Sequence, residues 1–207
     1  MPARSKSKPR VFHEISWSVF HAKADFEIEN LVRLQGHGGA LQPPQGRRGF
    51  PEYPETPRFV IGRAKKGPLP SDVELFHWYW FISDRMKVLF ETLDPEAFAF
   101  SRCDVLLADG TPGPKHWLCD VVRVLEAFAE PTRQQLRERN TKIFELRNDR
   151  ALDFDEQAIG GARFFRTPYM MPVVFCDDGV KQACKAGGMR GVRFRECSSK
   201  RRRQSAP

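Results

Sequence analysis

The stretch that most constrains the fold is residues 76–93, FHWYWFISDRMKVLFETL, in which the hydrophobic period changes at Ser83. Before Ser83, apolar and aromatic residues occupy both sides of an extended chain, which predicts a strand with both faces covered. After Ser83, apolar residues recur at helical spacing and predict the buried stripe of an amphipathic helix. These residues are Met86, Leu89, Phe90 and Leu93. The stretch therefore predicts a strand that passes directly into a helix.

The limits of this helix are also indicated by residue type. Ser83 is a suitable N-cap because its hydroxyl can accept a hydrogen bond from an unpaired N–H of the first turn. Asp84 adds negative charge at the positive end of the helix dipole. Pro95 disfavours helical geometry at Asp94, so we expect the helix to end there.

A weaker copy of the same junction occurs at residues 173–187. An apolar strand candidate meets Asp177, a second cap residue, and a short apolar stripe at helical spacing follows. The stripe consists of Val180, Ala183 and Cys184. Gly187 and Gly188 are expected to end this second helix. Strand-to-helix junctions commonly look like this, so the likeness does not establish an internal repeat.

The remaining pattern is one of short strands. Period-two alternation predicts a strand with one buried face over residues 11–19. Residues 117–128 fit either a helix or a strand, and their β-branched valines slightly favour the strand. A further strand is expected from residue 25 to near Leu34. Other strand candidates are residues 58–63, 97–103, 105–107, 142–146, 162–166, 171–176 and 191–196. The sequence predicts a single-domain α+β fold, with a mixed, mainly antiparallel sheet of short strands and two short amphipathic helices.

The basic charge is concentrated at the two ends of the chain. The formal net charge is +8, from 34 basic and 26 acidic residues. Residues 1–10 and 198–207 carry four basic residues each and no acid, so the body between them is neutral. We expect two disordered basic tails around one folded domain at residues 11–197. Nucleic-acid binding is then expected only weakly, through the tails.

Residues 35–57 form the most irregular segment of the chain. Ten of its 23 residues are Gly or Pro, a composition that supports neither a helix nor a strand ladder. A long surface loop is predicted, and a disordered insertion is the alternative. The loop contains four residues of types that anchor interfaces when a scaffold holds them. These are Arg47, Arg48, Phe50 and Tyr53.

Residues that could carry catalysis or hold a metal are sparse. His116 and Asp120 would share a face if their segment were helical, but they lack the further ligands of a metal site. His77 is expected to be a buried core histidine. No phosphate-binding loop, dinucleotide fingerprint or nucleophile elbow occurs in the sequence. The sequence therefore predicts a protein that is not an enzyme and uses no metal or cofactor.

The cysteines and the hydropathy indicate the compartment. Five cysteines, an odd number without a C-x-x-C pair, favour free thiols in a reducing environment. The basic start is not followed by an apolar signal segment, and no apolar run approaches the roughly 20 residues needed to span a bilayer. We expect a cytoplasmic protein without a membrane partner.

The order of three segments is more specific than any of them alone. They are FISDRMKVLFETLDPEAFAF, KHWLCDVVRVLEAFAE and ARFFRTPYMMPVVFCDDGVKQACKAGGMRGVRFRE. Over residues 76–196, and more loosely over 11–34, the chain resembles the eleventh immunity-protein family of bacterial polymorphic-toxin systems. The matching positions are residues 82–86, 117–128, 165–166 and 188–194. The chain departs from the family pattern where Cys119 and Asp120 replace the usual Leu-Asn and Glu126 replaces the usual Asp.

This resemblance implies a cytoplasmic antidote that binds a cognate toxin domain and blocks it without catalysis. Under this interpretation Arg47, Arg48, Phe50 and Tyr53 are the predicted toxin-binding residues. The alternative function is a nucleic-acid-associated protein that uses its basic tails. Added salt separates the two hypotheses, because binding of phosphates by tails weakens steeply with salt and a packed protein interface weakens much less.

Overall fold

The computed structural model describes residues 9–17, 25–34, 42–62, 69–138 and 152–197. Most of both predicted tails and the strand candidate at residues 142–146 lie outside these ranges. The described helices are α1 (Leu31–Leu34), α2 (Asp84–Leu93), the 3-10 helix η1 (Pro95–Ala97), α3 (Glu130–Glu138), α5 (Glu156–Ile159) and α6 (Asp178–Ala186). The described strands are β1 (Phe12–Trp17), β2 (Phe26–Ile28), β3 (Arg58–Ile61), β4 (Val73–Phe76), β5 (Tyr79–Ser83), β6 (Phe98–Arg102), β7 (Asp104–Leu107), β8 (His116–Val121), β9 (Phe164–Phe165), β10 (Val174–Asp177) and β11 (Val192–Glu196).

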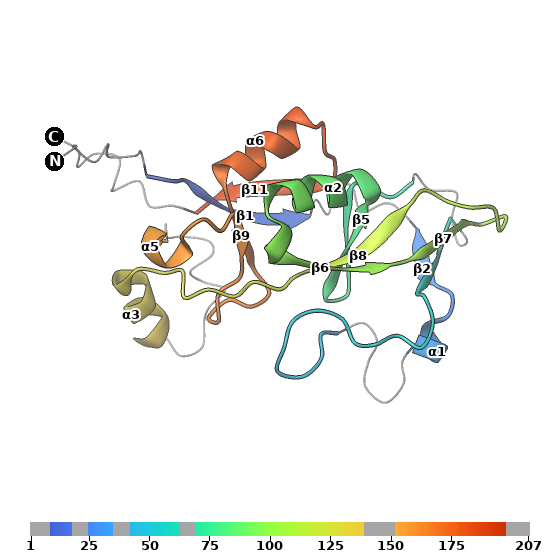
Figure 1. Ribbon diagram of the computed structural model, residues 1–207, viewed down its shortest axis with the longest axis horizontal. Coiled ribbons are helices and arrows are strands. Elements are labelled where there is room, and N and C mark those ends of the chain that lie inside the picture. Colours follow the sequence, from blue (N-terminus) through green and yellow to red (C-terminus); the bar gives the residue numbers. More distant parts are fainter. Residues whose placement is uncertain (1–8, 18–24, 35–41, 63–68, 139–151, 198–207) are drawn as a thin grey trace.

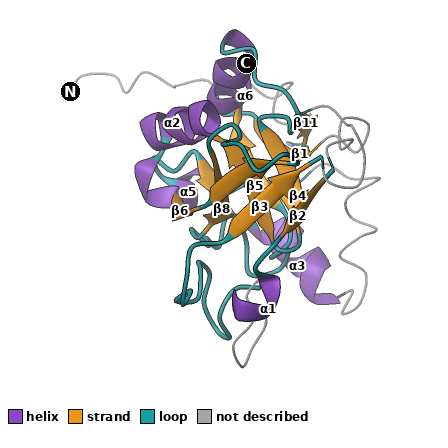
Figure 2. Cartoon of the chain, turned by 90° about the vertical axis from the view of Figure 1, so that its right-hand side faces the viewer, coloured by secondary structure: helices purple, strands orange, loops and turns teal. Residues whose placement is uncertain are grey.

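The strands form three sheets rather than the single sheet that was predicted. Their strand orders are β11-β1-β10-β9, β2-β3-β7 and β4-β5-β8-β6. Among the described strands only β3 and β7 pair in parallel, so the α+β class and the mainly antiparallel pairing are confirmed. Figure 2 shows the strands in the middle of the molecule, with α2 and α6 on one side and α1 and α3 on the other.

The sheet β4-β5-β8-β6 is covered on both faces. Trp80 and Ile82 of β5 face a cluster that includes α2, α6 and one side of the sheet β11-β1-β10-β9. Tyr79 and Phe81 face the opposite way, against residues of β3 and β7. All four side chains are buried, which confirms the prediction of a strand covered on both faces. A strand of this kind needs a layer on each side, and this is why the chain builds several sheets.

The strand β1 is buried on both faces too, so the prediction of one buried face for residues 11–19 is wrong. Ile15 lies in the same cluster as α2 and α6, whereas Phe12 lies in a third cluster with Phe165 and Phe175. The cause is the position of β1 between β10 and β11, with a packed layer on either side.

Arg10, predicted as part of the basic tail, donates hydrogen bonds to the carbonyl oxygens of Gly160 and Ala162.

Residues 76–82 form a hairpin rather than one strand. Phe76 pairs with Tyr79 and Val73 with Ile82, so the chain reverses at His77 and Trp78. His77 has a φ of 53°, the left-handed geometry that a two-residue hairpin turn requires. Both turn residues are therefore exposed, and the expectation that His77 is a buried core histidine is wrong. Trp78 is 53% exposed.

Both predicted strand-to-helix junctions are confirmed. The Ser83 hydroxyl accepts a hydrogen bond from the Met86 N–H at 3.3 Å, and the Asp177 carboxylate accepts one from the Val180 N–H at 2.9 Å. The two helices that follow, α2 and α6, lie side by side in Figure 1. The strand that was slightly favoured for residues 117–128 is also present, as β8, although it ends at Val121.

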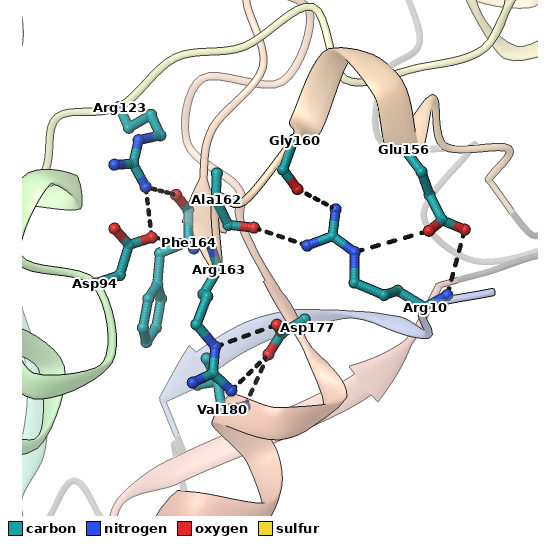
Figure 3. Close-up of polar contacts among 10 residues, drawn as sticks. All are labelled: Arg10, Asp94, Arg123, Glu156, Gly160, Ala162, Arg163, Phe164, Asp177 and Val180. Atoms are coloured by element: carbon teal, nitrogen blue, oxygen red, sulfur yellow. Dashed lines mark hydrogen bonds and ion pairs between the residues drawn. The ribbon is translucent and has the colours of Figure 1, made fainter. Parts of the chain in front are cut away.

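Carboxylates join segments that are far apart in the sequence. Asp94, at the end of α2, accepts hydrogen bonds from the backbone N–H groups of Arg163 and Phe164 at 2.8 and 3.1 Å and pairs with Arg123. The Arg163 side chain reaches Asp177 at the start of α6, as Figure 3 shows. These contacts fix the ends of both helices to the strand β9.

We predict that the stability of the fold depends more on Phe90 than on the cap of α2. Phe90 is fully buried and Leu89 only partly, so Phe90→Ala should cost about 3–5 kcal/mol in free energy of unfolding and Leu89→Ala less. Ser83→Ala should cost about 1 kcal/mol through loss of the cap. Chemical denaturation measures all three. A larger loss for Leu89→Ala than for Phe90→Ala would contradict the burial described here.

We also predict that the protein loses stability as the pH falls below neutral. Burial lowers the pKa of His13 and of His116 from the ordinary value of 6.5, and for His13 this outweighs its hydrogen bond to Asp178. Below about pH 6.5 the unfolded chain therefore binds more protons than the folded one, and the free energy of unfolding decreases. Denaturation at several pH values checks this. His13→Gln should reduce the slope, and an unchanged slope in this variant would contradict the assignment for His13.

Candidate functional site

His116 and Asp120, considered in the sequence as possible metal ligands, have separate structural roles. Both are buried on the same face of β8. The His116 ring stacks on Phe81 at a centroid distance of 4.6 Å, and its Nδ1 lies 2.9 Å from the carbonyl oxygen of Pro114. In the described part of the chain, no group of three or more His, Cys, Asp or Glu is arranged to hold a metal ion.

Asp120 is the acceptor at the centre of a buried charge cluster. Its side chain is fully buried and pairs with two arginines, Arg48 and Arg166. The backbone N–H of Gly49 donates to its second oxygen at 2.8 Å. Gly49 has a φ of 103°, which a residue with a side chain rarely adopts, so glycine suits this turn. The cluster ties residues 42–57, here called the anchored loop, to β8.

The two guanidinium groups outnumber the carboxylate between them. Arg166 also donates to the backbone oxygens of Val121 at 2.9 Å and Met171 at 2.5 Å. Burial and the nearby charge of Arg48 lower the pKa of Arg166 to about 10, so it remains protonated at neutral pH. The cluster therefore carries an excess positive charge at the base of the anchored loop.

Aromatic contacts hold the other half of the anchored loop. The Phe50 ring lies 4.5 Å from that of Tyr79, and the Tyr79 hydroxyl donates to the carbonyl oxygen of Gly49 at 3.1 Å. Burial raises the pKa of Tyr53 and of Tyr79, so both phenols stay neutral. Residues 42–57 thus contain no helix or strand yet make specific contacts with the sheet.

The four residues predicted to bind a toxin are therefore placed differently. Arg48, Phe50 and Tyr53 are only partly exposed and make contacts within the fold. Arg47 is exposed, and no ion pair involves it among the described residues. The four lie on the anchored loop, but of these only Arg47 is exposed. Their contact with a partner stays a prediction.

An open groove of about 540 Å³ lies beside the anchored loop. We call it the Trp78 groove. It is lined by Gln42, Pro43, Pro44, Gln45, Gly46, Arg47, Arg48, Trp78, Val122, Val124 and Met171. Trp78 and Val124 are two of the large apolar side chains that the fold leaves exposed. The sequence interpretation missed both, because it assigned each to a strand candidate. In Figure 1 the anchored loop runs along the lower side of the molecule, below β6 and β8.

An ordered loop beside a partly apolar groove defines a candidate protein-binding surface. Comparison with protein families identifies the class: the model described as Immunity protein family (Imm11) matches residues 13–199. The chain therefore belongs to the Imm11 immunity protein family, which confirms the resemblance noted in the sequence. No curated protein matches the chain. Within the described ranges, no helix is both long and apolar enough to cross a membrane.

We predict that removing the central carboxylate destabilises the fold strongly. Asp120→Ala leaves Arg48 and Arg166 buried without a counter-charge and should cost about 3–5 kcal/mol in free energy of unfolding. The control is Glu91→Ala, which removes an exposed carboxylate from an i,i+4 pair with Lys87 and should cost at most about 0.5 kcal/mol. Chemical denaturation compares the two. Similar small losses would show that the cluster contributes little.

Proposed function

We propose that this protein binds a cognate toxin domain of a polymorphic-toxin system in the cytoplasm and neutralises it without catalysis. The observation that carries the proposal is the match to the immunity family over residues 13–199, nearly the whole chain. Inhibition is steric: the bound protein covers the active surface of the toxin. Such inhibition requires a surface that keeps its shape when the partner arrives.

The packing of the anchored loop supports this mechanism. Binding by a loop that is already ordered avoids the entropy cost of ordering it, and more of the contact energy then appears as affinity. The Asp120 cluster and the tilted ring contact of Phe50 with Tyr79 provide this order in the unbound protein. The loop therefore presents its exposed residues in one arrangement.

The predicted toxin-binding residues take two roles in this proposal. Arg47 contacts the toxin directly, since its side chain is exposed. Arg48, Phe50 and Tyr53 act mainly by holding the loop against the sheet. Replacing all four by alanine would therefore lower stability as well as affinity, so single substitutions are the informative ones.

The direct test uses a toxin domain identified among the genes adjacent to this one. Co-expression of this protein should restore growth to cells that produce the toxin, and calorimetric titration of the purified pair should show binding with a stoichiometry near one to one. The control is the same protein carrying Asp120→Ala, which should protect less because its folded population falls. Absence of both binding and protection for the unmodified protein would overturn the proposed function.

A further inference from the structure

The charges around the Trp78 groove point to the chemistry of its occupant. The described residues that line it include two arginines and no acid. Arg47 is exposed, and the Nε of Arg48 is buried with no hydrogen-bond partner in the described part of the chain. Behind Arg48 the single carboxylate of Asp120 is shared with Arg166. The groove thus has an unbalanced positive charge and an unsatisfied buried donor.

Apart from Gln42, Gln45 and Gly46, the rest of the lining is apolar. Trp78 at the hairpin turn is 53% exposed and Val124 is 38% exposed. Pro43, Pro44 and Met171 complete the apolar surface. Exposed tryptophan and arginine are the residue types that most often dominate the energy of protein interfaces. A ligand that fits this groove therefore brings an apolar side chain as well as negative charge.

We propose that the Trp78 groove receives a toxin segment in which an Asp or Glu stands next to an aromatic or large aliphatic residue. This inference rests on the proposed function. The carboxylate pairs with Arg47 and offsets the excess charge of the Arg48–Asp120–Arg166 cluster, and the apolar side chain packs on Trp78 and Val124. Desolvation on binding strengthens the charge pairing, because the groove is bordered by apolar side chains.

The groove suits a protein segment better than a nucleic acid. Binding of a phosphate backbone depends on several exposed cations that follow the strand. Among the residues that line the groove, Arg47 supplies an exposed cation, whereas the Arg48 head group is already bound to Asp120. The carboxylate of one acidic residue matches this single exposed charge.

The experiment titrates the toxin domain encoded beside the gene with four single variants. Arg47→Glu and Trp78→Ala change the groove, and each should raise the Kd at least about tenfold, equivalent to about 1.4 kcal/mol. Arg102→Glu and Val88→Ala are matched controls, since both residues are exposed and do not line the groove. The Kd of each control should stay within about twofold of the unmodified protein. Thermal unfolding should show that all four variants remain folded.

A charge exchange then tests the acidic partner residue. Substitutions of Asp and Glu by Lys across the toxin surface should include one that weakens binding to the unmodified protein and restores binding to Arg47→Glu. Binding that is unaffected by both groove variants would overturn the groove assignment while the antidote function stands. A toxin that does not bind the unmodified protein would instead defeat the proposed function itself. Tight RNA binding or dimer formation that Trp78→Ala abolishes would show a different occupant and would also overturn the inference.

Discussion

The buried carboxylate of Asp120 is the contact on which the arrangement of the molecule depends most. It lies on β8, in a sheet covered on both faces, and it binds one arginine from the anchored loop and one from the segment after β9. Three parts of the chain that are distant in sequence therefore meet at one charge. Removing a charge from such a cluster is costly because the remaining charges stay buried. The arrangement is also specific, since a loop in another position would remove the contacts of Asp120 with Arg48 and with the Gly49 N–H and leave only its pair with Arg166.

This contact links the fold to the proposed binding surface. The anchored loop is rich in Gly and Pro and has no helix or strand to order it, so its position depends on the contacts of Arg48, Gly49 and Phe50. Those contacts place Arg47 near the exposed turn at Trp78, which belongs to a different part of the sequence. The groove exists because the loop and the hairpin are both fixed to the same sheet.

The features that sequence could predict are local ones. Capping chemistry predicted that helices begin at Ser83 and Asp177. The apolar run after Trp78 predicted a strand that is covered on both faces. The hairpin turn could not be predicted in this way, because His77 adopts a positive φ that sequence patterns assign to Gly or Asn. The groove was also missed, since its walls come from four separate segments whose approach depends on long-range packing.

The residue type at position 120 carries structural meaning. The residue here is Asp, and the structure pairs its carboxylate with two guanidinium groups. An amide there would keep one acceptor oxygen only, so it could not accept hydrogen bonds from both arginines and from the Gly49 N–H in this arrangement. It would also supply no negative charge, so the cluster would be more positive still. The charge at position 120 thus sets how much positive charge is left for a partner to neutralise. Because Arg47, Trp78 and Val124 lie outside this cluster, substitution of these exposed groove residues leaves the contact that orders the loop in place. A binding surface built in this way can change its partner without rebuilding its support.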